Sequence, residues 1–287
     1  MPTMRLAIIS DIHGNLPALE AVLADIRQSG VDRIICLGDI ASIGPNPVAC
    51  MDIVCDLNGV TLQGNHELYL LGQEVHKDWE TCPSWAPVRW ARDRLRKSDF
   101  DYMRTLPICY EWQENGRFPL TFYHASPRNQ FLGFLPHLNN DEILERMNGL
   151  DHTILIVGHT HRQLYLPWSH SRIINTGAVG LPLDDPRAKY AIITLKKNRW
   201  HVELRAIEYN KQWLLDEFRR TRLPETNLVT AAYCYQMWIG QPIASNYLDK
   251  LRQFARQQQI SVAEAYKLLP VPAEVRQWCE AYGFTAN

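Results

Sequence analysis

The first sixty residues alternate between short apolar runs and amphipathic segments, and this alternation limits the possible folds more than any other feature. The apolar runs lie at 6–9, 33–37 and 60–63. Runs of this length, each followed by a polar turn, are typical of buried parallel strands. Between them, Pro17 to Gly30 has helical spacing behind Asn15 as N-cap, and Asn46-Pro47 opens a second helix. The order strand, helix, strand, helix, strand predicts a parallel sheet with helices packed on it.

Further strand-like runs follow a middle segment, residues 70–106, that is typical of loops and helices. They lie at 120–123, 153–157, 163–166, 172–174, 190–195 and 201–207. Among them, one helix is expected to begin at Asn140 and end at Gly149, and another to cover 209–222. We therefore expect an α/β fold in which two sheets pack face to face with helices outside.

The chain changes character after Pro224, where the remaining sequence is helix-like. Breaks occur at Gly240 and at three prolines, and Ser261 opens a capping box. We expect residues 1–225 to form one domain and residues 226–287 a helical extension, with a boundary at 225 or as late as 240. The apolar stripes of the extension must be buried, either against the same chain or against a partner. A monomer, or a homodimer formed through these helices, is therefore expected.

Composition and charge exclude several classes of protein. A formal net charge of −1 gives no reason to expect general nucleic-acid binding. No apolar run is long enough to span a bilayer, and the first residues lack the pattern of a signal peptide. The seven cysteines are scattered without a Cys-x-x-Cys pair, which is typical of reduced thiols in a cytosolic protein. We therefore expect a cytoplasmic protein that does not bind membranes.

Polar side chains follow five of the strand-like runs at the point where each run ends. They are Asp11, His13, Asp39, Asn65, His66, His124, His159 and His161. Any one of them alone is more often a turn, cap or hydrogen-bonded residue than a ligand. However, ligands bind at the carboxyl ends of strands in open α/β sheets, so the recurrence in five places predicts a common site.

The chemistry of this set suits metal ions. Carboxylates, an amide carbonyl and neutral imidazoles are oxygen and nitrogen donors, which suit Mn, Fe or Zn better than thiophilic ions. With His66 set aside, seven donors remain, which are too many for one ion but suit two ions that share a bridging carboxylate. We expect two divalent ions, Mn or Fe first and Zn as an alternative. Their residual positive charge would attract a phosphate, and the pair would acidify a bound water.

The motifs DIHGN, GDI, GNHE, the His124 segment and GHTH, in this order, resemble those of the calcineurin-like metallophosphoesterases. The small bacterial and archaeal phosphoesterases of that superfamily are the most similar, and the stretch Asn175–Gly180 is similar to their late motif. The resemblance covers the chain from Arg5 to Pro224. It implies a four-layer α/β/β/α metallophosphoesterase sandwich with residues 1–225 as the catalytic domain, here carrying a C-terminal helical extension.

The resemblance also implies a role for each strand-end residue. Asp11, His13 and His161 would hold the first metal, and Asn65, His124 and His159 the second. Asp39 would bridge the two ions. His66 would be the general acid that protonates the leaving oxygen, while a metal-bridging hydroxide attacks phosphorus in line.

The sequence departs from better-known relatives in ways that bear on the substrate. Protein phosphatases of this superfamily carry an Arg soon after the bridging Asp, but residues 40–45 contain none. Arg128 is a candidate for phosphate binding because guanidinium matches phosphate geometry, and a solvated surface Arg is the alternative. Asn15 is a second candidate for the phosphate. The segment Trp79–Trp90 fits either a lid that stacks on a nucleobase or core packing.

The late loop also differs from the subgroup pattern, because Ala178 and Leu181 replace a hydroxyl and an amide residue. We expect a hydrolase that cleaves a phosphoester or phosphoanhydride bond of a small phosphodiester, nucleotide or dinucleoside polyphosphate. A broad phosphomonoesterase or a protein phosphatase is the alternative among enzymes. A scaffold of the same fold, like the retromer subunit that has lost metal ligands, is the alternative outside them.

Overall fold

A five-stranded mixed sheet forms the first half of the fold, in the order β10-β9-β1-β2-β3. The computed structural model describes residues 4–57, 59–113, 119–197 and 199–286. The strands are β1 (Arg5–Ile9), β2 (Arg33–Cys36), β3 (Gly59–Thr61), β9 (Ala188–Lys196) and β10 (Arg199–Ile207). The first three are parallel to one another, as the alternating sequence predicts, while β9 runs antiparallel to β1. The carboxyl ends of β1, β2 and β3 therefore meet at one edge.

A second five-stranded sheet has the order β4-β5-β6-β8-β7. Its strands are β4 (Cys109–Trp112), β5 (Leu120–Tyr123), β6 (Ile154–Val157), β7 (Gln163–Trp168) and β8 (Ser171–Thr176). The edge strand β4 was not among the expected strands. It contains the exposed Glu111 and none of its residues is buried, so its pattern does not stand out from a loop.

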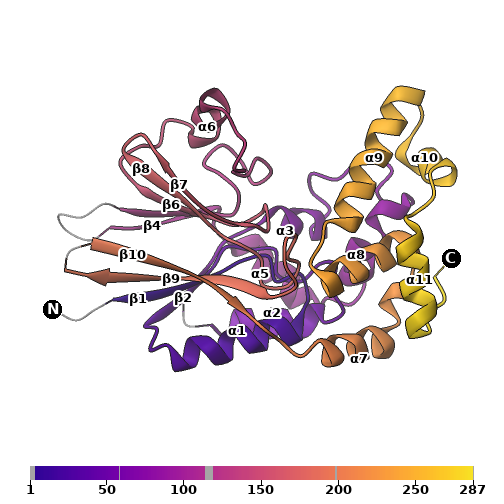
Figure 1. Cartoon of the computed structure of the whole chain (residues 1–287), viewed down its shortest axis with the longest axis horizontal. Coiled ribbons are helices and arrows are strands. Elements are labelled where there is room, and N and C mark those ends of the chain that lie inside the picture. Colours follow the sequence, from indigo (N-terminus) through magenta and orange to yellow (C-terminus); the bar gives the residue numbers. More distant parts are fainter. Residues whose placement is uncertain (1–3, 58, 114–118, 198, 287) are drawn as a thin grey trace.

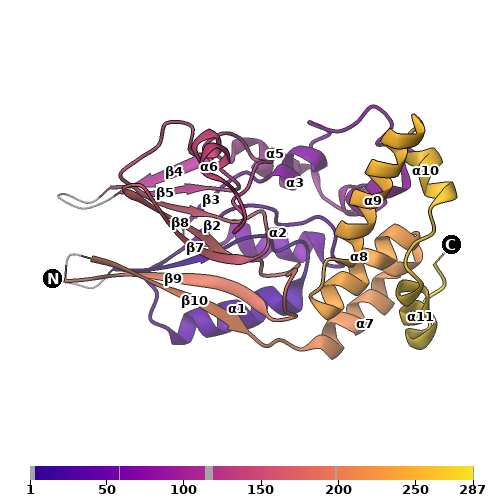
Figure 2. The same cartoon turned by 45° about the horizontal axis from the view of Figure 1, so that its top comes forward.

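The two sheets pack face to face, as Figures 1 and 2 show. Fully buried side chains from both sheets, among them Ile8, Leu37 and Phe122, fill the space between them. Each such side chain contributes about 1.5–3 kcal/mol by leaving water. This shared layer fixes the distance between the strand ends of the two sheets.

Helices cover both outer faces and complete the four-layer α/β/β/α sandwich. On the first sheet lie α1 (Leu16–Gln28) and α2 (Pro47–Cys55), and on the second lies α6 (Asn140–Met147). The helix α7 (Lys211–Thr221) lies beyond the end of the first sheet, where it packs against α1 (Figure 1). Asn15 caps α1 as expected, by accepting the Ala18 N–H at 3.2 Å. Asn46 stands at the N-cap of α2 but makes no capping bond; its amide nitrogen donates to Glu217, and its Oδ1 has no partner among the described residues. Gly30 and Gly149 directly follow the C-caps of α1 and α6 with positive φ, so both helices stop at the predicted glycines.

The middle segment forms short helices beside the first sheet. They are α3 (Asn65–Leu70), the 3₁₀ turn η1 (Pro83–Trp85), α4 (Ala86–Arg92) and α5 (Lys97–Thr105). Within it, Trp90 is buried in the main core, and Trp85 packs edge-on against Tyr69 with ring centroids 4.9 Å apart. Arg92 lies over the ring of Trp79. The tryptophans therefore pack against the protein itself, which was the alternative to a substrate-stacking lid.

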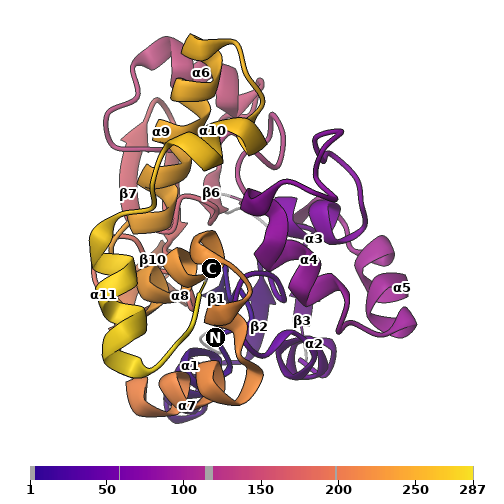
Figure 3. The ribbon, with the colours of Figure 1, turned by 90° about the vertical axis from the view of Figure 1, so that its right-hand side faces the viewer.

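The C-terminal segment is helical, as the sequence predicted. It contains η2 (Leu223–Glu225), α8 (Leu228–Ile239), α9 (Ile243–Gln258), α10 (Val262–Leu268) and α11 (Ala273–Tyr282). The capping box at Ser261 is present. These helices stand at the end of the sandwich where the parallel strands finish (Figures 1 and 3), and their apolar faces belong to the same core cluster as α1 and α2. The extension thus packs against its own chain. In the described residues no helix is both long and apolar enough to cross a membrane.

Trp278 is the centre of this packing. It is 5% exposed and its ring contacts those of Phe218 on α7, Tyr235 on α8, and Phe284, with centroid separations of 6.1, 5.7 and 5.1 Å. One aromatic side chain therefore joins the last helix to two preceding ones.

We predict that Trp278→Ala lowers the free energy of unfolding of the whole chain by about 3–5 kcal/mol, the usual cost of deleting a buried large aromatic side chain. Leu268→Ala is the matched control in the same extension, because Leu268 is 66% exposed, and it should change stability by less than about 0.5 kcal/mol. Denaturant titration followed by circular dichroism measures both. Two separate transitions, of which only a minor one shifts, would mean that the extension folds apart from the sandwich.

Candidate metal centre

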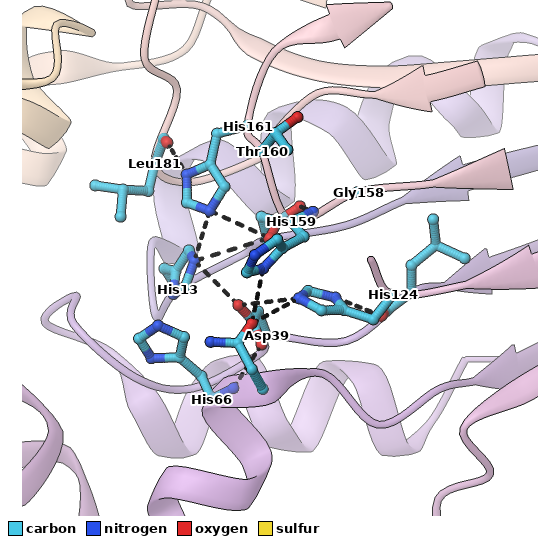
Figure 4. A network of polar contacts seen from close by, with 12 residues as sticks. His13, Asp39, His66, His124, Gly158, His159, Thr160, His161 and Leu181 are labelled. Carbon is cyan, nitrogen blue, oxygen red and sulfur yellow. Dashed lines mark hydrogen bonds and ion pairs between the residues drawn. The ribbon is translucent and has the colours of Figure 1, made fainter. Parts of the chain in front are cut away.

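The strand-end residues singled out in the sequence converge at one end of the sandwich. Asp11 and His13 follow β1, Asp39 follows β2, and Asn65 is the first residue of α3, just after β3. From the second sheet, His124 follows β5, and His159 and His161 follow β6. All seven lie in a single network of polar contacts, and most of it is shown in Figure 4.

Most of these residues have an unusual backbone conformation. Asp11, His13, Asp39, His159 and His161 all have φ between 47° and 66°. A residue with a side chain pays about 1–2 kcal/mol for this left-handed conformation. Strain concentrated at one place is a mark of a functional site, because a fold keeps it only where side-chain direction matters.

Hydrogen bonds between the loops hold this strained backbone in place. The N–H of Asp11 donates to the carbonyl of Gly38 at 3.1 Å, and the N–H of His13 donates to that of Asp39 at 2.9 Å. Across the two sheets, the N–H of His159 donates to Asp11 Oδ2 at 2.9 Å. The β1, β2 and β6 loops therefore fix one another.

Glycines permit the close approach of these loops. A Cβ on Gly64 would lie 2.2 Å from Asp39 Oδ1, and a Cβ on Gly158 would lie 2.0 Å from Ser10 Oγ. Neither distance is possible for a real side chain. The glycines of the GNHE and GHTH motifs are thus required by the crowding around the two carboxylates.

The seven side chains fall into two sets that share Asp39. In the first set, His161 Nε2 lies 3.2 Å from both Asp11 Oδ1 and His13 Nε2. The His13 Nε2 atom in turn lies 3.6 Å from Asp39 Oδ2. In the second, Asn65 Oδ1 lies 2.9 Å from both His124 Nε2 and His159 Nδ1, and His124 Nε2 is 3.4 Å from Asp39 Oδ2. This division is the one that the resemblance implied, and the metal-binding roles themselves stay predictions.

Carbonyl groups determine which ring nitrogen faces the centre. His124 Nδ1 is 2.9 Å from the carbonyl of Leu37, and His159 Nε2 is 2.9 Å from that of Phe131. His161 Nδ1 similarly faces the carbonyl of Leu181. A carbonyl only accepts hydrogen bonds, so each of these nitrogens must carry a proton. In the neutral ring the opposite nitrogen then presents its lone pair inward, as a metal ligand does.

These lone pairs crowd one another in a way that a cation would relieve. Asn65 Oδ1 is an acceptor, yet it lies 2.9 Å from inward-facing nitrogens of His124 and His159. Asp11 Oδ1 is buried without a hydrogen-bond donor. Convergent acceptors are unfavourable unless protons or metal ions lie between them, so the residues present fit divalent ions with mixed oxygen and nitrogen ligands.

The charges of the site agree with this interpretation. Burial works to raise the pKa of Asp39, but His124 and His66 outweigh it and hold the pKa well below the usual range. Burial works to lower the pKa of His124, but Asp39 outweighs it and raises the pKa to about 9. Burial lowers the pKa of His159 to about 4. Burial likewise works to raise the pKa of Asp11, but His161 outweighs it and lowers the pKa. Asp11 and Asp39 are therefore both ionised and demand positive charge, to which protonated His124 contributes when no metal is bound.

Glu67 is a positioning residue that the sequence reasoning missed. It is fully buried, and its carboxylate accepts the backbone N–H groups of Asp39, Ile40 and Gly64, each at 2.8 Å. Burial and the nearby Asp39 charge raise its pKa to about 7. In the sequence, the one sign of this role was that Glu67 is the last residue of the GNHE motif, three residues after Gly64. It connects the β2 loop to the start of α3.

Ser42 is a second residue that the sequence did not reveal. It is fully buried, with Oγ 2.6 Å from His66 Nδ1 and 3.3 Å from His13 Nδ1. A hydroxyl can donate one hydrogen bond and accept two, so it can hold His66 in either protonation state. His66 also packs edge-on against His13, with ring centroids 4.7 Å apart.

The two candidate phosphate ligands are placed differently from the metal set. Asn15 is fully buried, and its side chain is already engaged with Ala18 N, the Gly180 carbonyl and Tyr209 Oη. Its amide therefore holds α1 and the late loop, and none of its polar atoms faces a substrate. Arg128 is exposed and is not among the described residues that line the cleft beside the metal set.

A cleft of about 400 Å³ opens beside the metal set. His13, Asp39, Asn65, His66, His159 and His161 form its floor. Arg146 and Arg162 are the arginines among the described residues that line it. The late loop contributes Leu181, and its backbone is bonded to the β1 loop through the Val179 and Gly180 N–H groups. The loop thus acts through its backbone, which does not require the hydroxyl and amide it lacks.

Comparisons with known proteins agree with this geometry. Residues 4–198 match the calcineurin-like phosphoesterase superfamily domain. The uncharacterised protein MJ0912 of Methanocaldococcus jannaschii is 31% identical over 241 residues, which cover 78% of this chain and 96% of that protein. Phosphodiesterase YfcE of Escherichia coli is 30% identical over 200 residues, covering 66% and 87%. A crystal structure of a metallophosphoesterase from Sphaerobacter thermophilus is 30% identical, with a TM-score of 0.67, covering 83% of this chain and all of that one.

The extent of the family match and the two-sheet fold lead to one conclusion. The chain belongs to the calcineurin-like phosphoesterase superfamily, among its small bacterial and archaeal phosphoesterases, and is a metal-dependent phosphoesterase.

Proposed function

We propose that this chain is a binuclear phosphohydrolase that cleaves small phosphodiesters. The observation that carries the proposal is the division of seven candidate ligands into two sets around one shared carboxylate, Asp39. Asp11, His13 and His161 would hold one divalent ion, and Asn65, His124 and His159 the other. Manganese or iron suits this mixture of oxygen and nitrogen donors, with zinc as an alternative.

When bound, such a pair of ions acidifies a water molecule and neutralises charge on the phosphate oxygens. The chain's own residues have three further tasks. Asp39 holds the two ligand sets at a fixed separation, and Glu67 fixes the backbone of Asp39. The walls of the cleft exclude bulk water from the phosphate, which strengthens every electrostatic contact there.

In this mechanism His66 would give a proton to the leaving oxygen. Its Nδ1 is held by Ser42, and its Nε2 has no hydrogen-bond partner within the described parts of the chain. Burial lowers the pKa of His66, which makes its protonated form a stronger acid. Its backbone N–H donates to Asp39 Oδ1 at 2.8 Å, so the acid is fixed relative to the bridging residue.

One observation favours a phosphodiester, and a second counts against a protein phosphatase. The relative YfcE is named a phosphodiesterase. The protein-phosphatase alternative lacks support, because residues 40–45 contain no Arg and Arg128 is outside the cleft. Nucleotides and dinucleoside polyphosphates contain the same diester or anhydride linkage and belong to the proposed substrate class.

The first test is the metal dependence of hydrolysis. The full-length protein should cleave bis(p-nitrophenyl) phosphate, lose the activity on chelation, and regain it with Mn better than with Mg, which prefers all-oxygen octahedral sites. Release of nitrophenol is the measurement. Full activity in protein shown to be metal-free would sink the proposal, and so would inactivity with every divalent ion, as expected of a scaffold.

The second test concerns the leaving group. We predict that His66→Ala slows hydrolysis of an alkyl diester by about 10²–10⁴-fold, while a nitrophenyl diester is slowed much less because nitrophenolate leaves without a proton. His201→Ala, at an exposed position on β10, is the matched control and should alter neither rate. Metal content by mass spectrometry should be unchanged. An equal loss on both substrates would remove His66 from the role of acid.

A further inference from the structure

The C-terminal extension forms one wall of the cleft that contains the metal set. Tyr233 of α8 and Ser245 of α9 line the same cleft as His66 and His159. Both lie beyond residue 198, where the match to the superfamily domain ends. Figures 1 and 3 show α8 and α9 standing over the end of the sandwich where the strand loops converge.

Several contacts fix this wall relative to the metal loops. The carbonyl of Met237 on α8 accepts from Lys211 Nζ at 3.2 Å and from Tyr209 Oη at 3.4 Å. Tyr209 Oη in turn accepts from the amide of Asn15, two residues after the proposed ligand His13. At the end of α8, a Cβ on Gly240 would lie 2.4 Å from the carbonyl carbon of Asp185. The C-terminal end of α8 thus rests directly on the backbone of Asp185 and Pro186, which follow the late loop in the chain.

Ser245 is oriented by a buried residue of the preceding helix. Gln236 is fully buried, and its Oε1 accepts from Ser245 N at 3.1 Å and is 3.3 Å from Ser245 Oγ. The Gln236 Nε2 is buried and has no hydrogen-bond partner among the described residues, which is unfavourable for folding. The turn between α8 and α9 is therefore fixed in one conformation, even though this leaves the Gln236 Nε2 without a hydrogen bond.

The cleft beyond the metal set is lined by aromatic and cationic side chains. Phe131 and Tyr233 line it, and Tyr69 connects this surface to the acid, with ring centroids 5.1 Å from His66 and 6.1 Å from Phe131. Arg162 adds a positive charge to the lining. Asp39 is the only carboxylate among the described residues that line the cleft. Flat aromatic faces beside guanidinium groups suit a planar base attached to a phosphate.

We propose that Tyr233 of the extension is a specificity-determining residue, which stacks on the base of a nucleoside esterified to the scissile phosphate. The inference rests on the proposed function, because His66 marks the side of the leaving group and the aromatic surface begins beside His66. The substrate class is then a phosphodiester whose leaving group is a nucleoside. The extension, rather than the Trp79–Trp90 segment, supplies the stacking face.

The test compares two leaving groups on full-length, manganese-loaded protein. The substrates are methyl adenosine-5′-phosphate and ethyl methyl phosphate, followed by phosphorus NMR, since both leave an alkyl oxygen. The quantity compared is the KM for the nucleoside diester divided by the KM for the dialkyl diester. Tyr233→Leu should raise this ratio by about tenfold, because it removes one stacking contact between an aromatic ring and the base. Tyr233→Phe keeps the ring and should restore the wild-type ratio. Tyr235→Leu is the matched control, because Tyr235 lies on the same helix but packs against Trp278.

A binding measurement separates this inference from the proposed function. Calorimetry measures the Kd of an adenosine phosphonate and that of methylphosphonate, neither of which can be hydrolysed at its carbon–phosphorus bond. Tyr233→Leu should raise the ratio of the first Kd to the second by the same factor of about ten. Equal changes for both ligands, or the same change in Tyr235→Leu, would overturn the stacking role. If wild-type protein hydrolyses neither diester, the proposed function fails, while the Kd ratio still decides whether Tyr233 binds a base.

Discussion

The Asp39 carboxylate is the group on which the other parts of the site depend. It is 1% exposed and stands between two sets of metal-ligand candidates from both sheets. A buried charge is tolerated only when it is matched, so the surrounding imidazoles, the backbone N–H of His66 and any bound cation are coupled to it. The coupling extends to Glu67. The buried carboxylate of this residue accepts backbone N–H groups of Asp39 and its neighbours and so fixes their backbone.

The sandwich offsets the cost of assembling this site. Five of the seven candidate ligands have left-handed backbone, which is unfavourable for any residue with a side chain. The buried layer between the sheets supplies the compensating stability and keeps the ends of β1, β2, β5 and β6 together. The C-terminal helices add a further constraint, since α8 is bonded through Tyr209 to Asn15 behind the first metal loop.

Much of this arrangement could be predicted from sequence because it rests on local patterns. Apolar runs located nine of the ten strands, and the polar residues after them proved to lie together as the candidate ligand set. What could not be predicted depends on contacts between distant segments. The roles of Glu67 and Ser42 arise from neighbours in space. Asn15 was a candidate for phosphate binding, but Gly180 and Tyr209, far along the chain, occupy its amide. Helical spacing in the extension predicted burial, but not that Tyr233 would face the cleft.

The central claim is that one shared carboxylate organises two metal sites, and metal content tests it most directly. Full-length protein is saturated with Mn, freed of excess ion by gel filtration, and measured by mass spectrometry against protein concentration. The account predicts two ions per chain in the wild type, loss of both in Asp39→Ala, and two in the control Asp249→Ala, whose side chain is 76% exposed on α9. A wild type that holds a single ion, or an Asp39→Ala variant that stays folded and keeps one ion at full affinity, would contradict it.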